Sequence, residues 1–145
     1  NCFVMMPFDD EFKNIYEFGI KNACLELNIN CERVDEQTFT HTILEQIYNQ
    51  IKDADILIAD LTKPNLNVYY ELGYAHGNNK KVILLTSTNV GNIPFDLKTY
   101  PHIVYENNDL LNLKSKLIEK LTYFKNPDNI EFYKNKSYKR KYKKL

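Results

Sequence analysis

Short apolar runs alternate with longer amphipathic segments along this chain. The runs 2–6, 30–34, 55–59, 81–86 and 103–105 predict five strands. Three of them, 2–6, 55–59 and 81–86, are apolar at nearly every position, which is typical of strands buried on both faces of a parallel sheet. These three are therefore expected to be adjacent central strands.

The amphipathic segments between the runs predict helices. Residues 11–27, 43–54, a segment after Asn67 and a segment from Asn108 onward place apolar side chains at helical spacing. A strict alternation of strands and helices favours right-handed crossovers and helices on both faces of the sheet. The predicted fold class is α/β, a three-layer sandwich around a five-stranded parallel sheet.

The stretch 55–76 is the best candidate for a site. Its strand ends at Asp60, a loop follows, and Asn67 can cap a helix whose first turn holds Tyr69, Tyr70 and Glu71. Ligands of open α/β sheets collect beyond the carboxyl ends of the strands. The positive end of the helix dipole would favour an ionised Glu71. On spacing alone, an ordinary first-turn glutamate without a catalytic role is the preferred interpretation.

The inner face of this helix is predicted from its apolar positions. Val68, Leu72 and Ala75 share one stripe, which should face the sheet, and Gly73 could allow close approach to a strand.

Several segments together resemble the nucleoside 2-deoxyribosyltransferase superfamily over roughly residues 2–105. They are Met6-Pro7-Phe8, Ala-Asp-Leu-Thr at 59–62, Asn-Leu-Asn-Val-Tyr-Tyr-Glu-Leu-Gly-Tyr-Ala-His at 65–76 and Lys-Val-Ile-Leu-Leu at 81–85. The resemblance implies a flavodoxin-like strand order, 2-1-3-4-5. It also implies that Glu71 is a nucleophile that attacks the anomeric carbon, and that the loop of Met6, Pro7 and Phe8 covers the substrate. Related TIR domains that cleave NAD also use a helical glutamate.

Absent motifs narrow the chemistry. No G-x-G-x-x-G and no Walker loop is present, so neither a dinucleotide-binding Rossmann site nor a P-loop is supported, and no cofactor is predicted. Carboxylate chemistry remains. The resemblance implies what that chemistry acts on, so we expect cleavage or transfer at the N-glycosidic bond of a nucleoside, nucleotide or NAD, with Glu71 trapping an oxocarbenium-like state.

Other residues of the predicted site have supporting roles. Asp60 would orient substrate or assist proton transfer to the base, and Asn67 would position Glu71 or a sugar hydroxyl. Phe8 and Tyr69 would stack on or wall the base. Members of the family often share sites across subunits, so a homo-oligomer is expected. The alternative is a non-enzymatic nucleotide-sensing or TIR-like interaction module.

Composition indicates one soluble domain with a tail. The chain has 145 residues, 43% hydrophobic and 26% charged, and no apolar run near 18 residues, so a cytoplasmic protein without a membrane span is expected. Formal charge is zero overall, but eight basic and two acidic residues in 125–145 give +6 there and −6 elsewhere. We assign residues 1–125 to the α/β domain and residues 126–145 to a basic, Tyr- and Lys-rich tail or linker. A solvated tail is preferred over nucleic-acid contact. Because the sequence begins inside a strand and without Met, we expect it to be a domain of a longer protein.

Metal binding is not predicted. Cys2, Cys24 and Cys31 lack C-x-x-C spacing and lie in apolar surroundings, which fits reduced, buried thiols better than bridges or zinc ligands. The acidic residues 9–11 suit the first turn of a helix, with Asp9 as its cap, better than a metal site.

Two further features point toward the same edge of the sheet. Arg33 could bind a phosphate or carboxylate, although a surface ion pair with Asp35 is the preferred interpretation. The loop 87–101 is long enough to be a lid.

Overall fold

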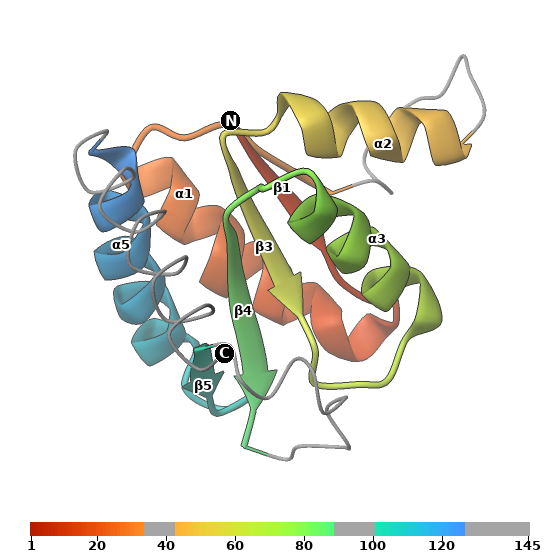
Figure 1. Cartoon of the computed structure of the whole chain (residues 1–145). Coiled ribbons are helices and arrows are strands. Elements are labelled where there is room, and N and C mark those ends of the chain that lie inside the picture. The colour runs from red at the N-terminus through yellow and green to blue at the C-terminus, as the bar shows by residue number, and fades with distance from the viewer. Residues whose placement is uncertain (34–42, 89–100, 127–145) are drawn as a thin grey trace, which may run out of the picture.

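The sheet has five strands, all parallel, in the order β2-β1-β3-β4-β5 (Figure 1). The structure is a computed structural model, and it describes residues 1–33, 43–88 and 101–126. The strands are β1 (Cys2–Met5), β2 (Cys31–Arg33), β3 (Ile56–Asp60), β4 (Val82–Ser87) and β5 (His102–Tyr105). The predicted fold class, the strand order and the adjacency of the three most apolar strands are confirmed.

The register of the central strands explains why they are apolar on both faces. Cys2 pairs with Ile56 and Met5 with Ala59, while Ile58 pairs in turn with Ile83. Every residue of β1 and β3 is buried, because helices cover both sides of the sheet.

Helices form the outer layers. They are η1 (Asp10–Phe12), η2 (Ile15–Lys21), α1 (Asn22–Glu26), α2 (Ile43–Asp53), α3 (Leu66–Gly77) and α5 (Leu110–Lys125). In Figure 1, α1 and α5 lie on one face of the sheet and α2 and α3 on the other. Two apolar cores result: one joins η2, α1 and α5 to the sheet, and the other joins α2 and α3 to it. No helix in the described ranges is long and apolar enough to cross a membrane.

The helical region predicted over 11–27 is not one regular α-helix. The 3-10 turn η1 is followed by the π-helical segment η2 and then by α1. Gly19 explains how closely η2 packs on α5, because a Cβ there would lie 2.8 Å from Cδ2 of Leu113. The helix α1 ends at Glu26, and Asn28 follows with a left-handed φ of 56°.

Helix α3 begins earlier than the sequence suggested. Its N-cap is Asn65, whose side chain accepts a 3.1 Å hydrogen bond from the backbone N of Val68, so the prediction that Asn67 is the cap is wrong. Glu71 consequently lies in the second turn.

The sheet-facing stripe of Val68, Leu72 and Ala75 is buried, as predicted. Gly73 is exposed, and a Cβ added to it would meet no atom within 4 Å, so its expected role in close packing is also wrong.

Some predictions concern residues outside those that the structure describes. These are the ion pair of Arg33 with Asp35, most of the proposed lid at 87–101, and the tail from 127 onward. The last helix begins at Leu110 with Asp109 as its cap, two residues later than the expected start at Asn108.

Candidate active site

A pocket of about 330 Å³ opens at the carboxyl edge of the sheet, beside β1 and the start of α3. Strands β1 and β3 are neighbours there, and the chain leaves them toward opposite sides, which is where ligands bind in doubly wound folds. The volume lies in the range of small-ligand sites. The lining residues are Val4, Met5, Met6, Pro7, Phe8, Leu44, Ile47, Asn65, Asn67, Val68, Tyr70 and Glu71.

The loop after β1 forms one wall. Met6 and Pro7 are buried, whereas Phe8 is 55% exposed. The guanidinium of Arg33 lies 5.5 Å from the centroid of the Phe8 ring and 4.6 Å from that of Tyr16. Arg33 is itself buried, so the expected surface location is wrong, while its pairing with Asp35 lies outside the described residues. One cation–π contact therefore supports Phe8, and a second ties Arg33 to Tyr16.

Glu71 lies on the opposite wall, on α3. Burial raises the pKa of its carboxyl to about 7. Desolvation thus opposes the ionised form that the helix dipole was expected to favour. The dipole acts mainly within the first turn, and Glu71 lies in the second, where desolvation dominates.

The carboxylate of Glu71 makes no hydrogen bond or ion pair with any residue in the described part of the chain. A half-buried carboxylate without a partner is available for a ligand. Strongly perturbed acids in pockets are typical of functional sites.

The tyrosine at the pocket is Tyr70, not Tyr69. Tyr69 does not line it but packs, partly buried, against the core beneath α3. Helical spacing could have indicated this, because Asn67, Tyr70 and Glu71 at i, i+3 and i+4 share a face. Asn67 is exposed and lines the pocket one turn before Glu71.

A cluster of tyrosines holds α2 against α3 next to the pocket. The hydroxyls of Tyr48 and Tyr70 share a 2.5 Å hydrogen bond. The ring of Tyr48 stacks on Tyr74 with centroids 4.3 Å apart. Tyr70 is thereby fixed at the rim, although 58% of it is exposed.

Asp60 does not line this pocket. It is completely buried at the end of β3, where its Oδ1 accepts a 2.9 Å hydrogen bond from the backbone N of Thr62 and its Oδ2 a 2.5 Å bond from the hydroxyl of Tyr105. Burial raises the pKa of Asp60, although the bonds from Thr62 and Tyr105 oppose the shift. The prediction that Asp60 and Glu71 share one cavity is wrong, because Asp60 points toward β5.

The acidic residues after β1 are engaged by a lysine. Lys63 forms an ion pair with Asp9 and a second, 3.6 Å long, with Glu11. Asp9 precedes η1 but makes no side-chain cap, because it bonds to Lys63 instead. These contacts join the loops after β1 and β3 at the edge of the sheet.

The sequence was also compared with models of known protein families. The family model of nucleoside 2-deoxyribosyltransferases matches residues 6–114. No curated protein matches the chain.

Two solved structures share the fold. The TIR domain of the Toll-related receptor TRR-2 from Hydra magnipapillata has a TM-score of 0.66 at 13% identity and covers 86% of this chain and 98% of its own. The flavodoxin-like domain of a Synechococcus protein has a TM-score of 0.56 at 13% identity and covers 84% and 99%.

The chain belongs to the nucleoside 2-deoxyribosyltransferase family. This family is enzymatic, and its reaction class is transfer at an N-glycosidic bond. The resemblance seen in the sequence is confirmed.

Proposed function

We propose that this protein cleaves or transfers at the N-glycosidic bond of a nucleoside, nucleotide or NAD, with Glu71 as the nucleophile. The observation that carries the proposal is a desolvated carboxylate in a pocket at the carboxyl edge of the sheet, with no partner among the residues that the structure describes. Family membership supports the reaction class.

In the proposed step, a carboxylate oxygen of Glu71 forms a bond to the anomeric carbon as the bond from that carbon to the base nitrogen breaks. The bonding pair leaves with the base, which takes up a proton from solvent. Water or a second base then attacks the same carbon and releases Glu71. This is the double displacement of a retaining glycosidase, applied to a C–N bond.

The remaining walls suit a nucleoside. Phe8 offers one ring face to a base, because Arg33 occupies the other side. Met6 and Pro7 provide an apolar floor, and Asn67 can hydrogen-bond a sugar hydroxyl beside Glu71. Tyr70 takes the place that the sequence assigned to Tyr69. Asp60 keeps a structural role under this proposal, with no direct part in proton transfer.

The fold similarity to a receptor TIR domain favours a second candidate, a nucleotide-sensing or interaction module that binds without turnover. Incubation with a panel of nucleosides, nucleotides and NAD, followed by chromatography for free base, separates the two. Release of base supports the enzyme. Binding of a nucleotide without release from any substrate supports the sensing module.

Two further features of the proposal concern assembly and the tail. The protein is expected to form a homo-oligomer, and residues 1–125 are expected to fold and act without 126–145. The end of α5 at Lys125 supports that boundary.

A further inference from the structure

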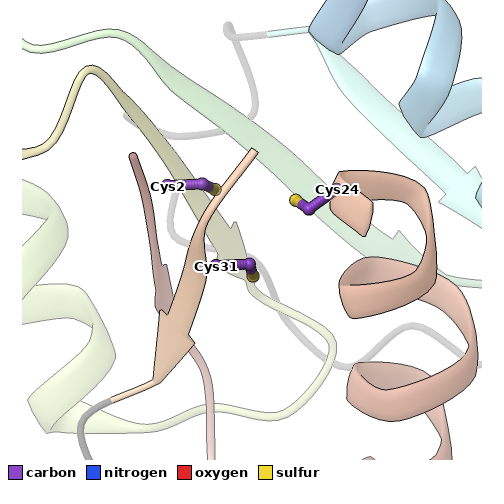
Figure 2. A group of neighbouring side chains, drawn as sticks. All are labelled: Cys2, Cys24 and Cys31. Atoms are coloured by element: carbon purple, nitrogen blue, oxygen red, sulfur yellow. The ribbon is translucent and has the colours of Figure 1, made fainter. Parts of the chain in front are cut away.

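Three cysteines far apart in the sequence converge in the core of the domain. The sulfur atoms of Cys2, Cys24 and Cys31 all lie within 4.8 Å of one another (Figure 2). All three are buried and free. In Figure 2 the side chain of Cys24 points from its helix toward the two strands that carry Cys2 and Cys31. The chain has only these three cysteines, so its whole complement is gathered at one point.

The backbone fixes each of the three positions separately. Cys2 and Cys31 begin β1 and β2 and are direct partners in the parallel register. Cys24 lies in the last turn of α1, where its carbonyl oxygen accepts hydrogen bonds from the backbone N of Leu27 at 3.2 Å and of Ile29 at 2.9 Å. The cluster is therefore held in place by the fold before any ligand arrives.

The cluster is chemically distinct from the pocket. It lies at the amino ends of β1 and β2, whereas the pocket lies beyond the carboxyl end of β1. Its surroundings are apolar, and they include Ile20, Ala23 and Ile56. Whatever it binds is thus independent of the proposed reaction of Glu71.

We propose that Cys2, Cys24 and Cys31 form a binding site for a soft, thiophilic metal ion, Cu(I), coordinated by three sulfurs. Thiolates select Cu(I), Zn(II) and iron–sulfur clusters among the metals that proteins use. Structural zinc sites are almost always four-coordinate, and no His, Asp or Glu ligand atom joins the three sulfurs within the described ranges. Three soft ligands in a site lined by apolar side chains fit a three-coordinate ion.

The geometry requires little rearrangement. With a metal–sulfur distance of about 2.3 Å, as in zinc thiolates, the sulfurs of a planar trigonal site are about 4.0 Å apart. An equilateral triangle with sides of 4.8 Å, the upper limit here, needs each sulfur to move inward by only about 0.5 Å. Side-chain rotation and small backbone shifts can supply such a movement.

Binding of Cu(I) would form metal–sulfur bonds and release thiol protons to solvent, with no electron transferred. Affinity for Cu(I) should therefore fall as pH falls.

The test is a titration of the full chain with Cu(I) under reducing, oxygen-free conditions, in competition with a chromophoric Cu(I) chelator. The expected result is one Cu(I) per chain. X-ray absorption at the copper edge should show three sulfur neighbours at about 2.2 to 2.3 Å. Each of Cys2→Ala, Cys24→Ala and Cys31→Ala should weaken Cu(I) binding by at least about 100-fold, because even the loss of an outer-shell partner costs 10 to 100-fold.

The matched control is Ile56→Val, which also removes one buried heavy atom from this core but no sulfur. It should bind Cu(I) like the wild type. Thermal melting without metal identifies any Cys variant that fails to fold. If a variant does not fold, the X-ray absorption spectrum of the wild type still tests whether three sulfurs bind the copper. Failure of the wild type to compete for Cu(I), or Cys variants that bind as well as Ile56→Val, would overturn the proposal. So would Zn(II) binding tighter than Cu(I). Base release should be the same with and without Cu(I). Absence of base release in both conditions would count against the proposed function and would leave the copper site unaffected.

Discussion

The hydroxyl of Tyr105 donates a 2.5 Å hydrogen bond to Asp60 across the intervening strand β4. Asp60 is completely buried, and its second oxygen accepts from the backbone N of Thr62. The Thr62 hydroxyl in turn accepts a 2.8 Å bond from the backbone N of Ser87. This network joins the ends of β3, β4 and β5 and leaves Asp60 turned away from the pocket.

Removal of the Tyr105 hydroxyl should therefore reduce stability rather than activity. Tyr105→Phe leaves an oxygen of Asp60 without its donor in a buried position, which costs about 1 to 3 kcal/mol in the free energy of unfolding. Urea denaturation measures this loss. Tyr70→Phe is the matched control, because it removes an exposed hydroxyl bond and should change the stability much less. A Tyr105→Phe variant with unchanged stability but base release reduced by more than about 100-fold would place Asp60 in the chemistry.

Arg33 should act on substrate binding through Phe8. Arg33→Met keeps the length of the side chain but removes the cation behind the ring. A cation–π contact is worth about 0.5 to 2 kcal/mol, so KM should rise about 2- to 30-fold while kcat changes little. Steady-state kinetics on the best substrate measures both.

Lys21→Met is the control for this variant. Lys21 and Arg33 both lie over the ring of Tyr16, at 5.6 Å and 4.6 Å from its centroid. Of the two, Arg33 also contacts the ring of Phe8. Equal effects of the two substitutions on KM would show that Arg33 acts through Tyr16 and the core, and that Phe8 does not need its support.

The raised pKa of Glu71 predicts how the reaction depends on pH. The nucleophile must be ionised, and the pKa of its carboxyl is about 7. The value of kcat/KM should therefore fall about tenfold per pH unit below 7 and level off above it. A profile from pH 5 to 9 tests this. A kcat/KM that stays constant down to pH 5 would mean that the reacting group has an ordinary carboxyl pKa.

The same shift predicts that Glu71 lowers stability at neutral and alkaline pH. Its pKa is about 7 in the folded protein against 4.5 for the unperturbed group, so between these values the folded state holds a proton that the unfolded state has lost. The free energy of unfolding thus decreases as pH rises from 4.5 to 7. Glu71→Gln removes this dependence and should be more stable than the wild type above pH 7, by up to about 3 kcal/mol.

Urea denaturation at pH 4.5 and pH 8 measures the difference. The two proteins should be similar in stability at the lower pH and should differ at the higher pH. If Glu71→Gln is no more stable at pH 8, the carboxylate is not desolvated in solution.

The fold could be predicted from the sequence because its strongest signals are local. The unbroken apolar runs of β1, β3 and β4 indicate burial on both faces, and that alone places them at the centre of a parallel sheet. The start of α3 was harder. Asn65 and Asn67 are equally good caps by residue type, and only the backbone geometry selects Asn65.

Side-chain directions at the site were less predictable. Tyr69 and Tyr70 are adjacent and alike, and only the helical spacing of Tyr70 from Asn67 separates them. Asp60 follows a central strand, as expected of a site residue, but its partner Tyr105 is 45 residues away in the sequence. The clustering of the three cysteines likewise depends on the register of β1 with β2, which spacing does not encode.

The central claim is that Glu71 is the nucleophile, and base release by Glu71→Gln tests it most directly. Glutamine keeps the size and hydrogen-bonding reach of glutamate but cannot form an ester with the anomeric carbon. Glu119→Gln, an exposed substitution on α5, is the control and should retain full activity.

The measurement is free base released over time from the best substrate, together with substrate affinity measured by calorimetry. Glu71→Gln should bind substrate within a few-fold of the wild type and release base at least about 1,000-fold more slowly, a difference of about 4 kcal/mol in the barrier. Base release by Glu71→Gln within about threefold of the wild type would contradict the assignment of Glu71 as the nucleophile.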